Sequence, residues 1–116
     1  MPDVRIGLLA RRQLVAVVEQ RRDQSGVLAA ERLRAAFDRF TTTVSQFPRV
    51  GALFHRAGDY EFRRFPVAGF TVHFRVGPTG HVVVADIRGG SMRPPQLDAL
   101  ERQAEQTAEG RPENRG

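Results

Sequence analysis

Three short runs of residues between positions 59 and 88 constrain the fold of this chain most strongly. In the middle run apolar residues alternate with polar ones, which is the period of a strand with one face in water; the apolar members are Phe70, Val72, Phe74 and Val76. Turn-forming clusters rich in Gly and Pro, at 66–69 and 77–80, separate this run from its two neighbours. We therefore predict three consecutive antiparallel strands, at 59–65, 70–76 and 82–87.

The register of the first β-hairpin can be predicted from cross-strand chemistry. A bend at 66–68 places Phe62 opposite Val72 and Glu61 opposite His73, so that apolar and oppositely charged residues pair. The same register puts Tyr60, the only tyrosine, on the apolar face. It predicts one polar sheet face that carries Glu61, Arg63, Thr71, His73 and Arg75. The alternation does not decide to which face the last strand adds Asp86 and Arg88.

The segments before the three strands read as a short strand and two helices. Residues 3–7 resemble a strand, and from Leu9 the apolar period becomes helical, up to a break at 23–26. A second helix at 27–47 has the clearest pattern, because its apolar residues recur at steps of three and four; they are Leu33, Phe37, Phe40, Val44 and Phe47. The predicted class is α+β, with a helical hairpin that covers one sheet face and leaves the other open.

The C-terminal segment reads as a separate extension. A Gly- and Pro-rich break at 89–95 precedes a short predicted helix at 96–107, and 109–116 has the composition of a disordered end. We divide the chain into a domain at 1–93 and an extension at 94–116.

Composition limits the classes of function. The chain has 116 residues and no Cys, which excludes disulfides and thiol chemistry, and His55, His73 and His81 lack the spacing of metal ligands. We therefore expect no metal or cofactor. No run is long enough to span a membrane and no leader is evident, so a cytoplasmic location is expected. Residues 1–93 carry 15 Arg against 8 acidic residues, a net charge of +7, which suits an anionic partner.

Several local motifs together resemble toxins of the RelE/ParE type, the toxic halves of type II toxin–antitoxin modules. The similar segments are Ala10-x-x-x-Leu14-x-x-Val17, Phe47-Pro48-Arg49-Val50-Gly51, the hairpin from Arg63 to Val76, and Asp86-Ile87-Arg88-Gly89. The resemblance covers about residues 3–93. It implies a helical hairpin packed on a twisted antiparallel sheet, with the first strand at the sheet edge. It also implies a cognate antitoxin that covers the active surface.

The resemblance leaves two branches of the family open. RelE-like members cut messenger RNA on the ribosome, and such a nuclease could be assembled here from Arg63, Arg75, Arg88 and His73, with positive charge to stabilise the transition state and a His for acid–base chemistry. ParE-like members act on DNA gyrase and are not nucleases. Thr71 and Arg88 replace an Arg and a His that are usual in the nucleases, and the segments 47–51 and 65–70 look more ParE-like. We therefore favour the gyrase branch.

In the ParE-like interpretation, the same region contacts the target or the antitoxin. The expected contact residues are Arg63, Thr71, His73, Arg75, Arg88 and Arg93. Two alternatives of another class remain, a non-toxic basic module that binds nucleic acid and an adaptor whose open face accepts an amphipathic helix. The sequence does not predict an oligomeric state.

Overall fold

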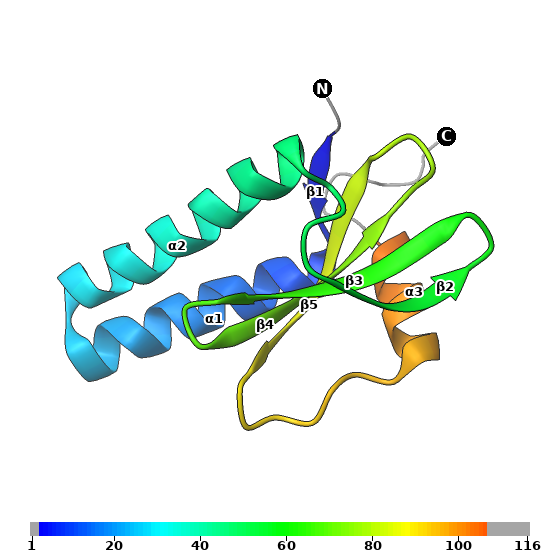
Figure 1. The fold of residues 1–116 in the computed structure, drawn as a ribbon. Coiled ribbons are helices and arrows are strands. Elements are labelled where there is room, and N and C mark those ends of the chain that lie inside the picture. The colour runs from blue at the N-terminus through cyan, green and yellow to red at the C-terminus, as the bar shows by residue number, and fades with distance from the viewer. Residues whose placement is uncertain (1–2, 107–116) are drawn as a thin grey trace.

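The computed structural model describes residues 3–106 of the chain (Figure 1). In chain order its elements are β1 (Val4–Ile6), α1 (Leu8–Ser25), α2 (Val27–Gln46), β2 (Ala52–Ala57), β3 (Tyr60–Val67), β4 (Phe70–Val76), β5 (Val82–Gly89) and α3 (Leu97–Glu105). The fold is α+β, as the sequence predicts, and the three predicted consecutive strands are β3, β4 and β5. The disorder predicted at 109–116 lies outside the described residues.

The sheet has five strands in the order β1-β5-β4-β3-β2. β1 joins the edge as a parallel neighbour of β5, and the other pairs are antiparallel. The resemblance implied that first-strand position. β2 was not predicted; it comes from the segment after α2 and forms the opposite edge.

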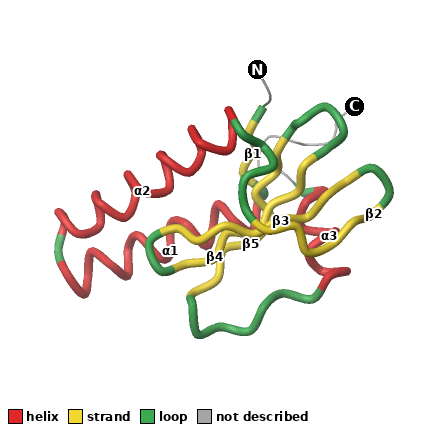
Figure 2. The backbone as a smooth tube through the Cα atoms, in the orientation of Figure 1, coloured by secondary structure: helices red, strands yellow, loops and turns green. Residues whose placement is uncertain are grey.

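The helical hairpin of α1 and α2 covers one face of the sheet, called here the near face (Figure 2). Its apolar stripe packs on alternate residues of β3, β4 and β5, and the resulting core includes Leu33, Phe37, Phe40, Val44, Val72, Phe74, Val76, Val84 and Ile87. The apolar period therefore predicted this contact correctly from Leu33 to Val44. It was wrong for Phe47, which follows the end of α2 and is 62% exposed.

The opposite face, called the far face, is partly covered by α3, which the ribbon shows on the other side of the sheet from α1 and α2 (Figure 1). Leu100 and Ala104 of α3 are buried against Phe62, Val83 and Ala85. The expectation of a wholly open second face was wrong, because the short helix has an apolar side that the sheet buries. Residues beyond 93 are thus part of the packed structure up to the end of α3.

The predicted register of the β3–β4 hairpin was wrong by three residues. β3 continues to Val67 and the turn contains only Ala68 and Gly69, both with positive φ (52° and 87°), as a two-residue hairpin turn requires. Phe62 therefore pairs with Arg75 rather than Val72. Pro66 is tolerated inside β3 because it lies beyond the last residue paired with β2.

This register divides the predicted polar face between the two sides of the sheet. Glu61 and Arg63 pair with Val76 and Phe74, so they lie on the near face. Thr71, His73 and Arg75 lie on the far face together with Arg64, the partner of His73. Tyr60 also points to the far face, where it is 39% exposed rather than in the core.

A β-bulge in β5 determines on which face of the sheet Asp86 and Arg88 lie. Val84 pairs with Phe74 but Asp86 pairs with His73, so Ala85 is an extra residue that reverses the alternation. Val84 consequently packs in the near-face core, whereas Asp86 and Arg88 join the far face.

Candidate functional site

Only part of the predicted site is brought together by the structure. Thr71, His73 and Arg88 lie side by side on the part of the far face that α3 does not cover, and all three line one pocket. We call this region the open half, and the part under α3, with Phe62, Val83 and Ala85, the covered half. Arg63 and Arg75 lie elsewhere.

Arg63 is held on the near face by structural contacts. Its Nε donates to Oε1 of Glu61 at 3.0 Å, and its Nη1 donates to the carbonyls of Arg49 and Gly51 at 2.9 and 3.0 Å. Burial alone would raise the pKa of Glu61, but the hydrogen bond from Arg63 and the charges of Arg63, Arg49 and Arg56 outweigh it and lower that pKa. Arg63 therefore fastens the 47–51 loop to β3, so two of the family-like segments, at 47–51 and 63–76, are joined by structural hydrogen bonds.

Arg75 is held at the margin of the covered half. Its Nη1 lies 3.0 Å from Oε2 of Glu105, at the end of α3, and its guanidinium lies 4.2 Å from the centre of the Tyr60 ring. Only 15% of its side chain is exposed. Arg75 thus anchors α3 to the sheet.

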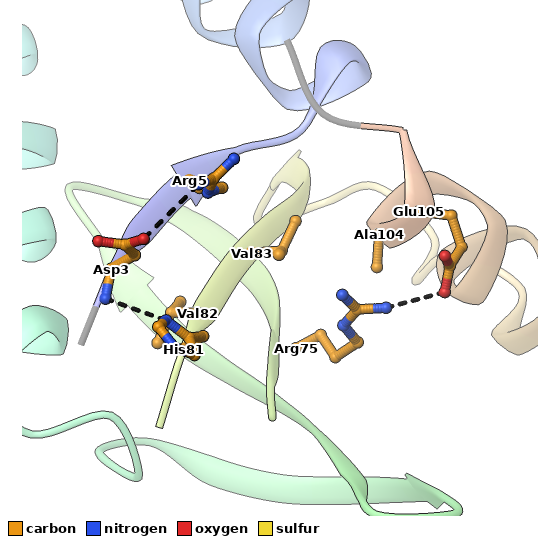
Figure 3. Close-up of a pocket in the computed structure, with 8 residues that line it drawn as sticks. All are labelled: Asp3, Arg5, Arg75, His81, Val82, Val83, Ala104 and Glu105. Atoms are coloured by element: carbon orange, nitrogen blue, oxygen red, sulfur yellow. Dashed lines mark hydrogen bonds and ion pairs between the residues drawn. The ribbon is translucent and has the colours of Figure 1, made fainter. Parts of the chain in front are cut away.

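A shallow pocket of about 330 Å³ lies beside this anchor, between β1, β5 and the end of α3 (Figure 3). Its charged groups are already partnered, because Arg75 contacts Glu105 and Arg5 lies 3.6 Å from Asp3. His81 accepts a hydrogen bond from the Asp3 amide at 3.4 Å. We therefore place the candidate site in the open half instead.

The open half contains a pocket of about 210 Å³, which we call the Arg64 pocket. Its lining residues come from β3, β4, β5 and the loop that follows β5; they are Arg64, Thr71, His73, Arg88, Gly89, Gly90, Met92 and Pro94. The loop is fixed at two points, since the Gly89 amide donates to Sδ of Met92 at 3.3 Å and Nη1 of Arg88 donates to the Arg93 carbonyl at 3.2 Å. Arg93, an expected contact residue, thus contributes its backbone to this site.

Arg88 is oriented by a buried carboxylate. Its Nε and Nη2 donate to the two oxygens of Asp86 at 2.8 and 3.2 Å, and Asp86 is only 1% exposed. The hydrogen bond from Arg88 to Asp86 raises the pKa of the guanidinium. A bidentate pair of this kind fixes both position and orientation, so Arg88 is held rigidly at the rim of the pocket.

Gln13 of α1 supports this pair from the edge of the sheet. β1 ends opposite Val84, and beyond that point the Ile87 amide donates to Oε1 of Gln13 at 2.7 Å. Nε2 of Gln13 donates to Asp86 at 3.3 Å. Gln13 therefore accepts a hydrogen bond from the backbone at the strand edge and donates another to the buried carboxylate of Asp86.

His73 lies at the base of the open half as a neutral imidazole. It is 4% exposed, and its Nδ1 is buried without a hydrogen-bond partner in the described structure. Burial lowers its pKa, the charges of Arg88 and Arg64 lower it further, and the charge and backbone of Asp86 oppose them. Phe54 of β2 packs edge-on against it at 5.8 Å between ring centres.

Arg64 is the functional candidate that the sequence analysis missed. It is exposed, and within residues 3–106 its side chain has no ion pair or hydrogen bond; its guanidinium lies 5.6 Å from the Phe54 ring centre. The residue pair Ala68-Gly69 was the available signal, because a two-residue turn there places Arg64 opposite His73.

A second hollow of about 400 Å³ adjoins the Arg64 pocket and shares Arg64 and Thr71 with it. Its remaining lining is largely apolar or backbone, from Gly51, Ala52, Phe65 and Pro66. We call these two adjoining hollows the groove; the Arg64 pocket is its cationic part and the second hollow its largely apolar part.

The described residues contain no cluster of three or more potential metal ligands, and none of the described helices is long and apolar enough to cross a membrane. The ionisable side chains that line the Arg64 pocket are two guanidiniums and the imidazole of His73. Such a set can bind an anion and can accept a proton.

Comparison with known families finds a match over most of the chain. The family model of the ParE toxin of the type II toxin–antitoxin system parDE matches residues 4–94. The match includes all five strands and the helical hairpin and ends before α3. No curated protein matches the chain at the required significance.

Proposed function

This chain belongs to the ParE toxin family of type II toxin–antitoxin systems, and from this premise we propose that it inhibits DNA gyrase and is neutralised by a cognate antitoxin. The observation that carries the proposal is the family match over the whole sheet and helical hairpin. The ParE-like branch that the sequence resembles acts on gyrase, a cytoplasmic target. Both partners of such a toxin are proteins, and we place their contact surface on the open half.

The open half suits a protein contact because its polar groups are preorganised. Arg88 is fixed by Asp86, and the loop after β5 is fixed by Arg88 and Met92. Arg64 adds a positive charge that has no acidic partner among the described residues. Arg88 and the loop after β5, being fixed already, lose little conformational entropy when they bind.

A second candidate function is a ribosome-dependent endoribonuclease, and the adjacency of His73 to two guanidiniums favours it. Its residues would be Arg64, Arg88 and His73, without Arg63 or Arg75. The burial of His73 and the distance of Tyr60, which contacts Arg75 beside α3, weigh against it. A general acid must reach the leaving group, and this cluster offers no exposed one.

Tightly controlled expression in a bacterium tests the proposal, with growth, an SOS reporter and bulk translation followed together. Growth arrest with SOS induction supports gyrase inhibition. Arrest with a prompt fall in translation and no SOS signal supports the nuclease. Normal growth at confirmed expression of folded protein contradicts both and leaves a non-toxic binding module.

Two variants locate the active surface in the same assay. Arg64→Ala removes the unpaired charge of the open half and is expected to relieve the arrest. Arg39→Ala removes the same charge from an exposed position of α2 without an ion pair in the described structure. It is expected to leave the arrest unchanged. Equal effects of the two variants would place the active surface elsewhere.

A further inference from the structure

The Arg64 pocket has an imbalance of charge that points to its ligand. We propose that this pocket binds the carboxylate of an acidic side chain from a protein partner, with Arg64 as the group that pairs with it. The adjoining hollow takes the apolar residue next to that acid. The inference rests on the proposed function for the partner's identity, while the pocket can be tested alone.

The charge imbalance follows from the groups that face the pocket. From β5, Arg88 is neutralised by Asp86 through two hydrogen bonds. From β4, His73 is neutral near physiological pH, because burial and the neighbouring guanidiniums lower its pKa. From β3, Arg64 has no acidic partner among the described residues, and the β2 residues beside it are the uncharged Ala52 and Phe54. The pocket therefore carries one uncompensated positive charge.

Donor geometry makes an oxyanion the matching ligand. A guanidinium presents a planar fork of N–H groups that fits a carboxylate. Thr71 is half-buried between the two hollows, and its hydroxyl can donate to a ligand that lies beside Arg64. A carboxylate here would also stabilise protonated His73, whose Nδ1 has no partner in the described structure.

The groove fits a peptide better than a nucleic acid. A chain of phosphates needs several cations in a row, whereas the groove has one unpaired cation, Arg64, among its described lining. Bases need a free aromatic face to stack on, and Phe54 already packs against Arg64 and His73. The apolar hollow beside Arg64 instead accepts an aliphatic side chain.

The test uses the full chain and blocked dipeptides as probes. N-acetyl-Leu-Glu-amide and N-acetyl-Glu-Leu-amide are titrated while the imidazole signals of His73 are followed by NMR, and their Gln counterparts serve as uncharged controls. We expect a saturable shift for at least one Glu dipeptide, with an affinity about tenfold or more above that of its Gln counterpart. The pKa of His73 should rise when that dipeptide is bound.

Variants and a competing anion test whether Arg64 binds the carboxylate. Arg64→Ala should weaken the Glu dipeptide about tenfold or more, whereas Arg39→Ala should leave its affinity unchanged. Absence of a saturable shift with either Glu dipeptide, or equal affinity for Glu and Gln, overturns the proposal. Inorganic phosphate that binds more tightly than both Glu dipeptides overturns it in favour of a phosphate site.

The two proposals fail in different experiments. If the dipeptide binds as expected but expression causes no SOS induction, the carboxylate pocket stands and gyrase inhibition fails. If SOS induction occurs but the dipeptide does not bind, gyrase inhibition stands and the pocket assignment fails.

Discussion

The covered and open halves of the far face are built from the same strands and nevertheless have opposite chemistry. Under α3, the strands present Phe62, Val83 and Ala85, which are buried against Leu100 and Ala104. A few residues further along the same strands they present Arg64, His73 and Arg88. The comparison shows that the apolar residues of the far face are those that α3 covers. Exposure alone does not explain the polar character of the other half, because its His73 and Asp86 are only 4% and 1% exposed.

The largest expected effect comes from the covered half. Leu100 is fully buried, so Leu100→Ala should remove apolar contacts and leave a cavity, at a cost of about 2–5 kcal/mol in the free energy of unfolding. Urea denaturation measures this loss. Leu97→Ala, in the same helix but 44% exposed, should change it by less than about 0.5 kcal/mol. Equal small losses would mean that α3 is not part of the cooperative structure.

A smaller loss is expected in the open half, at its buried ion pair. Asp86→Asn keeps the size of the side chain but leaves Arg88 without a carboxylate. The expected cost is about 1–3 kcal/mol, and Arg88 limits it because 27% of its side chain already reaches solvent.

The control for Asp86→Asn is the exposed ion pair of α3. Asp98 and Arg102 lie 3.6 Å apart with side chains 80% and 66% exposed, so Asp98→Asn should cost less than about 0.5 kcal/mol. The same denaturation measurement serves for both variants. A cost for Asp86→Asn as small as that of Asp98→Asn would show that the carboxylate does not hold Arg88 in solution.

The pH dependence of stability should also distinguish the two halves. His73 in the folded open half has a pKa below its ordinary value of 6.5, chiefly because of burial. As the pH falls below about 6.5, the imidazole of the unfolded chain takes up a proton before that of the folded chain. The contribution of His73 to stability is therefore constant above about pH 6.5 and decreases below it. Denaturation at pH 7.5 and 5.5 should show a smaller loss on acidification for His73→Gln than for the parent protein. An identical loss in both proteins would mean that His73 titrates normally.

The sequence was sufficient to predict the elements in which apolar periodicity alone determines the structure. The residues from Leu33 to Val44 predicted α2 and its core, and the alternation from Phe70 to Val76 predicted β4. Phe47, the last predicted member of the stripe, lies beyond α2 and is 62% exposed. Local periodicity determines such elements because one face packs and the other is wet.

The predicted register of the β3–β4 hairpin was wrong because it relied on cross-strand side-chain pairs, which contribute little energy. Pairing Glu61 with His73 is worth only tenths of a kcal/mol, whereas the turn residues Ala68 and Gly69 fix the pairing through the backbone. A further signal was present in β3, where Phe62 and Phe65 have opposite parity. Apolar residues on both faces of a strand indicate that both faces are covered, and here α3 covers the second one.

The bulge at Ala85 could not be located from β5 alone, because residues 82–85 are apolar at every position and show no alternation that a bulge could interrupt. Both the wrong register and the missed bulge affected the prediction of the site. With the wrong register Arg64 was assigned to the other face from His73, and without the bulge Asp86 and Arg88 had no assigned face.

The smallest expected effect on stability is also the one that most sharply separates structure from function. Arg64 is exposed and makes no side-chain hydrogen bond or ion pair within the described residues, so Arg64→Ala should change the free energy of unfolding by less than about 0.5 kcal/mol. Removing its charge also relieves the repulsion of protonated His73, which should raise the pKa of that imidazole in an NMR titration. Arg39→Ala should leave both quantities unchanged. A large loss of stability in Arg64→Ala would show that Arg64 is a structural residue like Arg63 and Arg75, and the chemical distinction between the two halves would then lose its functional meaning.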